Sequence, residues 1–330
     1  MMIQAVDNHV WGIILAGGNG QRVQQFTRKL YGEARPKQYC AFTGTRSMLT
    51  HTIDRVKEVI PTGRIVTIVN RDHLGYTNSE LQDYSTDNII IQPENRDTAP
   101  GILFPLLKIY NRDPNAIVAI FPSDHFIKEE GRFRDYMRVA ASFVSVYPEI
   151  LVMLGAVPDQ PEQAYGWIQV GEIAGKHLDK TLHRVEGFWE KPTIETVQAL
   201  HAEGCLWNTM ILVVRAEMLV KNFQRYTPRM YRSFKQILPI LDSSLEENVL
   251  NSVFAKLPST NFSRAILERI PHNLGVIPMK GVYWSDWGDE SRITSDCNRF
   301  GLALREELHV ARRPVQGMPR EEFVERALSI

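Results

Sequence analysis

Residues 10–22, VWGIILAGGNGQR, join a β-branched apolar run to a turn that contains three glycines. Such a run is typical of a strand buried in a parallel sheet. Gly17, Gly18 and Gly20 follow it, at a position where backbone N–H groups can converge on an anion. The stretch therefore predicts an α/β fold with an anion-binding turn after its first strand. From the glycines alone, a turn without a ligand remains an equal alternative.

Two common phosphate-binding motifs are absent from this turn. The dinucleotide fingerprint of Rossmann folds requires glycine where Val23 stands, and the P-loop requires Gly-Lys-Ser/Thr, which occurs nowhere in the chain. Arg22 and Lys37 flank the predicted strand end, and crowding two cations there is unfavourable unless an anion lies between them. The two cations favour an anionic ligand of another class.

Apolar runs and amphipathic segments alternate through the first half of the chain. Further strands are predicted at residues 64–70, 88–91, 116–121 and 150–156, and helices at 47–59 and 98–111. This order predicts a doubly wound α/β fold with a mostly parallel, mixed sheet. Later strands are predicted at 166–172, 183–192, 207–216, 274–279 and 281–284, and helices at 216–226 and 229–257.

No Gly/Ser-rich linker or charge block divides the chain, so one catalytic domain is predicted over residues 1–299. A charged helical extension is predicted over residues 300–330.

The charge and cysteine content narrow the class of protein. Lys plus Arg and Asp plus Glu each number 38, so no basic excess indicates a nucleic-acid or membrane partner. The three cysteines are far apart and form no CxxC pair, and the N-terminus lacks a basic signal-peptide region. We therefore expect a cytoplasmic protein without a spanning helix.

Two acidic residues complete the predicted site. Asp124 follows the strand at 116–121, where open α/β sheets bind ligands, and Asp286 follows the late strand pair. Taken singly, Asp124 is better interpreted as a helix or turn cap. Brought together, the two carboxylates would suit Mg²⁺ and phosphate rather than zinc. His125 has no second histidine at ligand spacing, which favours a packing or orienting role.

Eight short motifs follow one another along the chain in the order found in a known protein family. They are LAGGNGQR (15–22), RPKQY (35–39), PENRDTAP (93–100), FPSDH (121–125), YGWIQVGE (165–172), FWEKP (188–192), WNTM (207–210) and WSDWGD (284–289). The chain resembles the sugar-1-phosphate nucleotidylyltransferases, and within that superfamily the mannose-1-phosphate guanylyltransferases. The resemblance implies a Rossmann-like nucleotidyltransferase fold of GT-A type, over about residues 10 to 290.

The resemblance also implies roles for individual residues. The implied catalytic cations are Arg22 and Lys37, and the implied metal ligands are Asp124 and Asp286, with Mg²⁺ as cofactor. The implied nucleotide-binding residues are Leu15, Ala16, Gly17, Gly18, Gly20, Arg96 and Thr98. The implied sugar-phosphate-binding residues are Tyr165, Gly166, Glu190, Lys191 and Asn208.

The implied substrates are a nucleoside triphosphate, GTP by resemblance, and a sugar 1-phosphate, mannose 1-phosphate by resemblance. A phosphate oxygen of the sugar phosphate would attack the α-phosphorus and expel pyrophosphate. No general base is needed, because a phosphate monoester is mostly dianionic near neutral pH. Neither hexapeptide repeats nor a His-rich domain follows Asp286, so a single activity is expected, and a homodimer is compatible with the resemblance.

Four departures from the family pattern affect specificity. Asp97 stands where asparagine is usual, Met210 stands at a glycine position, and residues 32–35, GEAR, are an insertion. The insertion is interpreted as a surface bulge, with a lid that brings Arg35 to the triphosphate as the alternative. Asp289 and Glu290 add charge near Asp286 and are interpreted as a solvated helix start.

These departures leave alternative functions open. One is the same reaction with a different sugar or nucleotide, and another is a catalytically weak homologue that binds nucleotide sugars as a regulator. The sequence does not fix the sugar, the base, the oligomeric state or the pathway.

Overall fold

The computed structural model describes residues 8–82, 84 and 88–305 and is built around one nine-stranded sheet. The strand order is β3-β2-β1-β4-β9-β6-β10-β8-β7, and β7 also pairs with β9. The strands are β1 (Val10–Ala16), β2 (Ile65–Asn70), β3 (Ile89–Gln92), β4 (Ile117–Pro122), β6 (Leu151–Ala156), β7 (Gly166–His177), β8 (Lys180–Glu190), β9 (Leu206–Arg215) and β10 (Leu274–Pro278). The predicted mixed sheet is confirmed.

The parallel part of the sheet comes from the first half of the chain. β3, β2, β1 and β4 are parallel neighbours, with Gly12 opposite Ile65 on one side of β1 and Ala119 on the other. Every residue of β2 is buried, as expected for a strand covered on both faces. All five strands predicted in this half are present, because their β-branched apolar runs suit a buried sheet.

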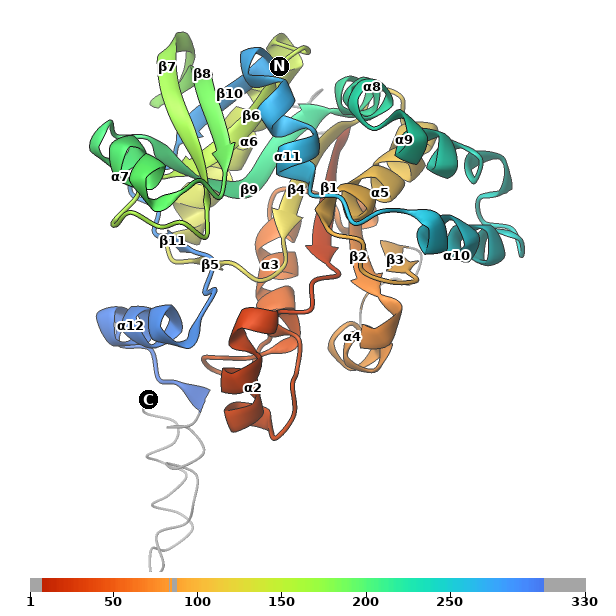
Figure 1. Cartoon of the computed structure of the whole chain (residues 1–330), viewed down its shortest axis with the longest axis horizontal. Coiled ribbons are helices and arrows are strands. Elements are labelled where there is room, and N and C mark those ends of the chain that lie inside the picture. Colours follow the sequence, from red (N-terminus) through yellow and green to blue (C-terminus); the bar gives the residue numbers. More distant parts are fainter. Residues whose placement is uncertain (1–7, 83, 85–87, 306–330) are drawn as a thin grey trace, which may run out of the picture.

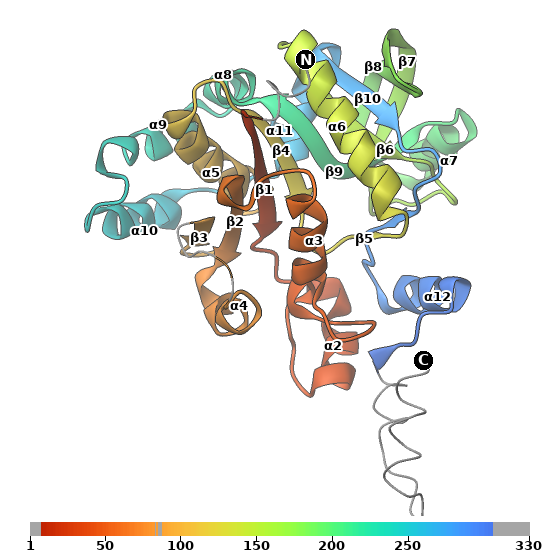
Figure 2. The ribbon, with the colours of Figure 1, turned by 180° about the vertical axis from the view of Figure 1, so that it is seen from behind.

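Helices cover both faces, which confirms the doubly wound architecture (Figures 1 and 2). The long helices are α3 (Met48–Lys57), α5 (Thr98–Arg112), α6 (Glu130–Val146), α8 (Ala216–Tyr226), α10 (Glu246–Lys256) and α12 (Glu290–Phe300). The short ones are α2 (Gln24–Tyr31), α4 (Leu74–Glu80), α7 (Ile194–Ala202), α9 (Pro228–Lys235) and α11 (Phe262–Ala265). α3 and α6 pack into one apolar cluster and α5, α8, α9 and α10 into another, so the sheet separates two cores.

Two predicted elements differ in the structure. The helix predicted over 229–257 is divided into α9 and α10, with a short turn at Leu238–Ile240 between them. Pro239 lies in this turn, where its missing N–H and fixed φ interrupt helical hydrogen bonding. The strand predicted over 281–284 is confined to β11 (Trp284–Ser285), which pairs with β5 (Phe126–Ile127).

A third apolar cluster holds α2 and α12 together beyond the carboxyl ends of the parallel strands (Figure 1). It contains Phe26, Phe42, Trp287 and Ile293, and α12 ends at a left-handed Gly301. Of the predicted extension over 300–330, residues 306–330 lie outside the described residues. Among the helices that are described, none is both long and apolar enough to span a bilayer.

Gly155 provides a test of the packing between β6, β9 and β10. A Cβ atom at this position would lie 2.7 Å from Leu206 Cδ1 and 2.9 Å from Val276 Cγ2. We expect Gly155→Ala to lower the free energy of unfolding by about 1–3 kcal/mol, because the added methyl group overpacks the core. Gly75→Ala is the matched control, since nothing lies within 4 Å of a Cβ there and Gly75 is helical. Equal urea unfolding midpoints for the two variants would contradict this packing.

Candidate active site

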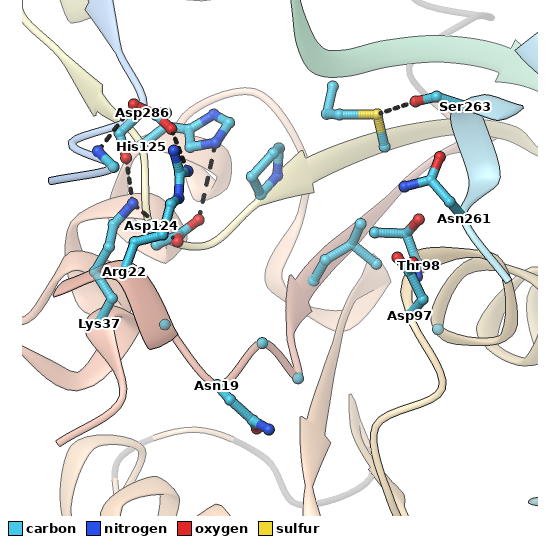
Figure 3. A pocket seen from close by; sticks show the side chains of 18 of the residues that line it. Asn19, Arg22, Lys37, Asp97, Thr98, Asp124, His125, Asn261, Ser263 and Asp286 are labelled. Atoms are coloured by element: carbon cyan, nitrogen blue, oxygen red, sulfur yellow. Dashed lines mark hydrogen bonds and ion pairs between the residues drawn. The ribbon is translucent and has the colours of Figure 1, made fainter. Parts of the chain in front are cut away.

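An open cleft of about 770 Å³ lies where β1 and β4 end, and it contains most of the predicted site residues. The predicted residues that line it are Leu15, Gly17, Gly18, Gly20, Arg22, Lys37, Thr98, Asp124, Tyr165, Gly166, Glu190, Lys191, Asn208 and Asp286. Figure 3 shows Arg22, Lys37, Asp124 and Asp286 at one side of the cleft and Thr98 at the other. Residues from distant parts of the sequence therefore share one cavity.

Ala16 and Arg96 do not line this cleft. Ala16 is fully buried, and its carbonyl oxygen accepts a 2.8 Å hydrogen bond from Nε2 of Gln38. The same Gln38 nitrogen donates to the carbonyl oxygen of Gly18, at 2.8 Å. Arg96 donates to Oε1 of Glu94 at 2.9 Å. The Ala16 carbonyl thus helps Gln38 to hold the glycine turn in place. Arg96 is held by Glu94 in its own loop.

The glycine turn brings the backbone close to Lys37. Gly20 has φ of 58°, and a Cβ atom there would lie 2.9 Å from the backbone nitrogen of Lys37. At Gly17, a Cβ atom would lie 2.4 Å from Nε2 of Gln92. Gly20 therefore requires glycine for its conformation and for the close approach of the Lys37 backbone, whereas a side chain at position 17 would displace the amide group of Gln92.

Lys37 connects the two predicted metal ligands. Its Nζ lies 3.0 Å from Oδ2 of Asp124 and donates to the backbone carbonyl oxygen of Asp286. The Lys37 side chain is only 5% exposed. Arg22 completes the cluster, with an Nη2 to Oδ2 distance of 2.8 Å to Asp286. Two cations and two carboxylates thus meet at one end of the cleft (Figure 3).

The cations keep both carboxylates ionised. Burial raises the pKa of Asp286, but Lys37, a hydrogen bond from Tyr165, and Arg22 outweigh it and bring that pKa to about 2. Burial likewise opposes ionisation of Asp124, yet the charge of Lys37 holds its pKa below the ordinary value. Both groups are therefore anionic at neutral pH and able to bind a hard cation.

Neighbouring groups fix the orientation of Asp286. The hydroxyl of Tyr165 donates to Oδ1 of Asp286 at 2.5 Å, and the backbone N–H of Gly288 donates to the same oxygen at 2.9 Å. Burial raises the pKa of Tyr165, and Asp286 raises it further, so Tyr165 stays a proton donor.

His125 lies beside this cluster and packs against Trp284. Its Nδ1 accepts a 3.2 Å hydrogen bond from Nε1 of Trp284, and the rings of the two residues pack edge to face. Burial lowers the pKa of His125 to about 4. The ring is therefore neutral at neutral pH and adds no charge to the cluster.

The residues predicted to contact a sugar phosphate form a second group. A Cβ atom on Gly166 would lie 3.0 Å from Oε2 of Glu190 and 3.1 Å from Cβ of Asn208, so these three positions adjoin. Burial raises the pKa of Glu190, whereas Lys191 and a hydrogen bond from Ser263 oppose the increase. Lys191 has φ of 52°, and its side chain is 56% exposed.

The cleft also contains polar residues that the sequence did not single out. They are Asn19, Gln92, Asn95, Ser259, Asn261 and Ser263. Gln92 is 3% exposed, and its Oε1 has no hydrogen-bond partner within the described residues. Its place at the end of a predicted strand is the signal that could have identified it, because such ends point into the ligand crevice.

The PENRDTAP segment (93–100), which holds the predicted nucleotide-binding residues Arg96 and Thr98, is tied to the start of α11 and the segment before it. The hydroxyl of Thr98 accepts from the backbone N–H of Phe262 at 2.9 Å, and the N–H of Ala99 donates to the carbonyl oxygen of Thr260. The carboxylate of Asp97 accepts from the N–H of Thr98 at 2.6 Å and caps α5. The Asp97 carboxylate is therefore already bound to a backbone N–H group. Asn261 and Ser263 lie on the same side of the cleft as Asp97 and Thr98 (Figure 3).

The insertion at residues 32–35 does not form a lid over this cleft. Arg35 donates to Oε1 of Glu33 at 3.2 Å, and its guanidinium lies over the rings of Tyr31 and Tyr76, 4.4 and 5.1 Å from their centroids. It is absent from the cleft lining. The structure thus favours the surface bulge.

The extra acidic residues after Asp286 begin a helix, as expected. Asp289 accepts from the N–H of Arg292 at 2.9 Å and caps α12. Glu290 pairs with Nζ of Lys29 at 2.8 Å on the surface.

Comparisons with known proteins identify relatives of this chain. A family model described as nucleotidyl transferase matches residues 11–296. A mannose-1-phosphate guanylyltransferase of Escherichia coli strain K12 is 31% identical over 290 residues, which cover 86% of this chain and 59% of that protein. The ManC mannose-1-phosphate guanylyltransferase of Salmonella typhimurium strain LT2 is 31% identical over 86% of this chain and 58% of its own length. The chain thus spans less than two thirds of these relatives.

Solved structures share the fold at lower sequence identity. One is described as a mannose-1-phosphate geranyltransferase from Thermus thermophilus, with a TM-score of 0.73, 23% identity, and coverage of 87% of this chain and 79% of that chain. Another, described as a mannose-6-phosphate isomerase from Helicobacter pylori, has a TM-score of 0.67 and 16% identity over 84% of this chain and 99% of that chain.

Proposed function

The chain belongs to the nucleotidyl transferase family, and on that premise we propose that it transfers a nucleotidyl group from a nucleoside triphosphate to a sugar 1-phosphate. The proposed donor is GTP and the proposed acceptor is mannose 1-phosphate, the substrates that the names of its relatives indicate. We propose the cytoplasm as the compartment, which suits three buried cysteines.

The observation that carries this proposal is the position of Lys37. Its ammonium contacts Asp124 and the Asp286 backbone beside a glycine turn, and Arg22 pairs with Asp286. A binding module has little need for two ionised carboxylates held together by two cations. Nucleotidyl transfer needs this arrangement, because negative charge must be neutralised while the reacting phosphates approach each other.

The proposed reaction forms one P–O bond and breaks another. An oxygen of the sugar phosphate attacks the α-phosphorus, and the bond from that phosphorus to the β-phosphate oxygen breaks, which releases pyrophosphate. Arg22 and Lys37 neutralise charge on the α-phosphate and the leaving group, and the glycine turn offers backbone N–H groups to the triphosphate. Orientation and charge neutralisation, rather than proton transfer, lower the barrier.

Asp124 and Asp286 fit a magnesium site of the kind completed by substrate. Within the part of the chain that the structure describes, no group of three or more His, Cys, Asp and Glu residues is arranged to hold a metal. Mg²⁺ is commonly bound by one or two carboxylates together with substrate phosphates and water, and both carboxylates are ionised. When bound there, Mg²⁺ would supply charge neutralisation at the phosphates.

A second candidate keeps the reaction and changes the substrates. Asp97 caps α5 through its carboxylate, and Met210 lies in the cleft at a glycine-like conformation. Both positions adjoin substrate-binding residues, so a different base or sugar is the specific alternative.

A pyrophosphate-release assay tests the proposal. The purified chain is incubated with Mg²⁺ and each combination of GTP, ATP, UTP, CTP and dTTP with mannose, glucose, galactose and fucose 1-phosphates. We expect the highest kcat/KM with GTP and mannose 1-phosphate. Highest activity with another pair supports the second candidate. Absence of release with every pair, together with measurable binding of nucleotide sugars, would instead indicate a regulatory protein.

A further inference from the structure

β9 is interrupted by a bulge at the wall of the cleft. Asn208 pairs with Gly155 of β6, whereas Leu212 pairs with Met153, so β9 contains extra residues between these two pairs. Met210 lies in the middle of this irregular stretch. A bulge of this kind redirects a side chain and is common beside active sites.

Hydrogen bonds hold the bulge in one conformation. The hydroxyl of Thr209 donates to the carbonyl oxygen of Leu154 at 2.6 Å and accepts from the N–H of Ile211 at 3.2 Å. The side-chain oxygen of Asn208 accepts from the N–H of Met210 at 3.0 Å. Because each residue from 208 to 211 takes part, the position of Met210 is built into the strand.

Met210 adopts a backbone conformation that favours glycine. Its φ is 56°, and a residue with a Cβ atom meets steric repulsion in this region. Met210 is half-buried and packs against the apolar cluster on the α5 side of the sheet, and regular pairing of β9 with β4 resumes from Leu212 to Arg215. The strained residue also contributes its side chain to the cleft lining.

The Met210 side chain adjoins the predicted sugar-binding group. Its Sδ accepts a 3.4 Å hydrogen bond from the hydroxyl of Ser263 (Figure 3). Ser263 also interacts with Glu190, which lies next to Gly166 and Asn208. A glycine at position 210 would leave the space of the thioether side chain open beside Glu190 and Asn208.

We infer that Met210 limits the size of the sugar that this cleft accepts. The thioether fills the space that an enlarged substituent at one position of the sugar ring would occupy. The cleft therefore accepts unmodified hexoses and rejects hexoses enlarged at that position. This inference rests on the proposed function, because it requires the sugar of a nucleotide sugar to lie beside Glu190 and Asn208.

Binding of nucleotide sugars tests this inference without requiring turnover. Calorimetry gives Kd values for GDP-mannose and for analogues enlarged at one position each, such as 2-acetamido and 3-, 4- or 6-O-methyl derivatives. For one of these positions, we expect Met210→Gly to improve the affinity of the analogue relative to GDP-mannose by about 10- to 200-fold, the range expected for a small apolar group in a pocket. Met210→Leu, which keeps most of the volume, should retain the rejection.

Leu178→Gly is the matched control. Leu178 also has a positive φ, of 54°, but it is 82% exposed and does not line the cleft. This variant removes the same kind of strain and should leave the Kd ratios unchanged. A thermal unfolding scan of each variant confirms that the comparison is made on folded protein.

The possible outcomes distinguish a failure of the size limit set by Met210 from a failure of the proposed nucleotidyl transfer. A shift in the Kd ratio with Met210→Gly in a chain that has no turnover supports the size limit and contradicts the proposed transfer. Turnover with unchanged Kd ratios for every analogue overturns the size limit and leaves the transfer intact. A chain that binds no nucleotide sugar overturns both.

Discussion

Lys37→Ala should lower kcat by about 10²- to 10³-fold, the usual effect of removing one preorganised cation or donor from a phosphate-transfer site. Lys37 is 5% exposed and contacts both Asp124 and the Asp286 backbone, so no other side chain can take its place without rearrangement. Steady-state pyrophosphate release at saturating substrates and Mg²⁺ measures the change. The loss should appear mainly in kcat, because the charge that Lys37 neutralises grows as the bond to the leaving group breaks.

The control for this variant is Lys29→Ala. Lys29 pairs with Glu290 on the surface and is 58% exposed, so its removal tests the loss of a lysine charge outside the cleft. We expect its kcat to stay within about 2-fold of the wild-type value, since surface ion pairs contribute little. Near-normal turnover of folded Lys37→Ala would contradict the role given to Lys37.

Asp124→Asn should also reduce turnover, by at least about 10²-fold. The amide keeps the shape of the side chain but removes the charge that would attract Mg²⁺, and its N–H₂ group cannot serve as a ligand. We therefore also expect the Mg²⁺ concentration for half-maximal activity to increase. A magnesium titration of the pyrophosphate-release rate measures both effects in one experiment.

Asp135→Asn is the matched control for that titration. Asp135 is 62% exposed and pairs with Arg138 on α6, outside the cleft lining. Its magnesium dependence should equal that of the wild-type protein. If Asp124→Asn keeps both the wild-type rate and the wild-type magnesium dependence, Asp124 is not a metal ligand and acts only as the ion-pair partner of Lys37.

The sequence predicts the first half of the fold well because its signals are local. Runs such as residues 10–16 and 65–70 are apolar and β-branched throughout, and buried parallel strands require that composition. The wrong prediction of one helix over residues 229–257 also has a local cause, because Pro239 in the sequence interrupts a helix.

The site could be predicted only in part, because side-chain direction depends on tertiary structure. Thr98 lines the cleft and Arg96 does not, although both stand in one motif, because the loop turns through Asp97 with φ of 67°. Asn261 and Ser263 reach the cleft from a distant part of the chain, whose backbone hydrogen-bonds to Thr98 and Ala99 of the PENRDTAP segment.

The only sequence signal for the conformation of Met210 was the family pattern, in which glycine is usual at this position. Residues 207–216 have the composition of a regular strand, and nothing local marks a bulge. The bulge depends on a side chain to backbone bond from Thr209 to Leu154, 55 residues away in the chain. Long-range contacts of this kind set the conformation of β9 where it meets the cleft.

Isotope transfer tests the central claim most directly, namely that the sugar phosphate itself attacks the nucleotide. The wild-type chain is incubated with Mg²⁺, GTP and mannose 1-phosphate whose terminal phosphate oxygens carry oxygen-18, and the products are analysed by mass spectrometry. We predict that all of the label is retained in GDP-mannose and that the released pyrophosphate is unlabelled. Label in the pyrophosphate, or GTP consumption without a labelled nucleotide sugar, would contradict this claim.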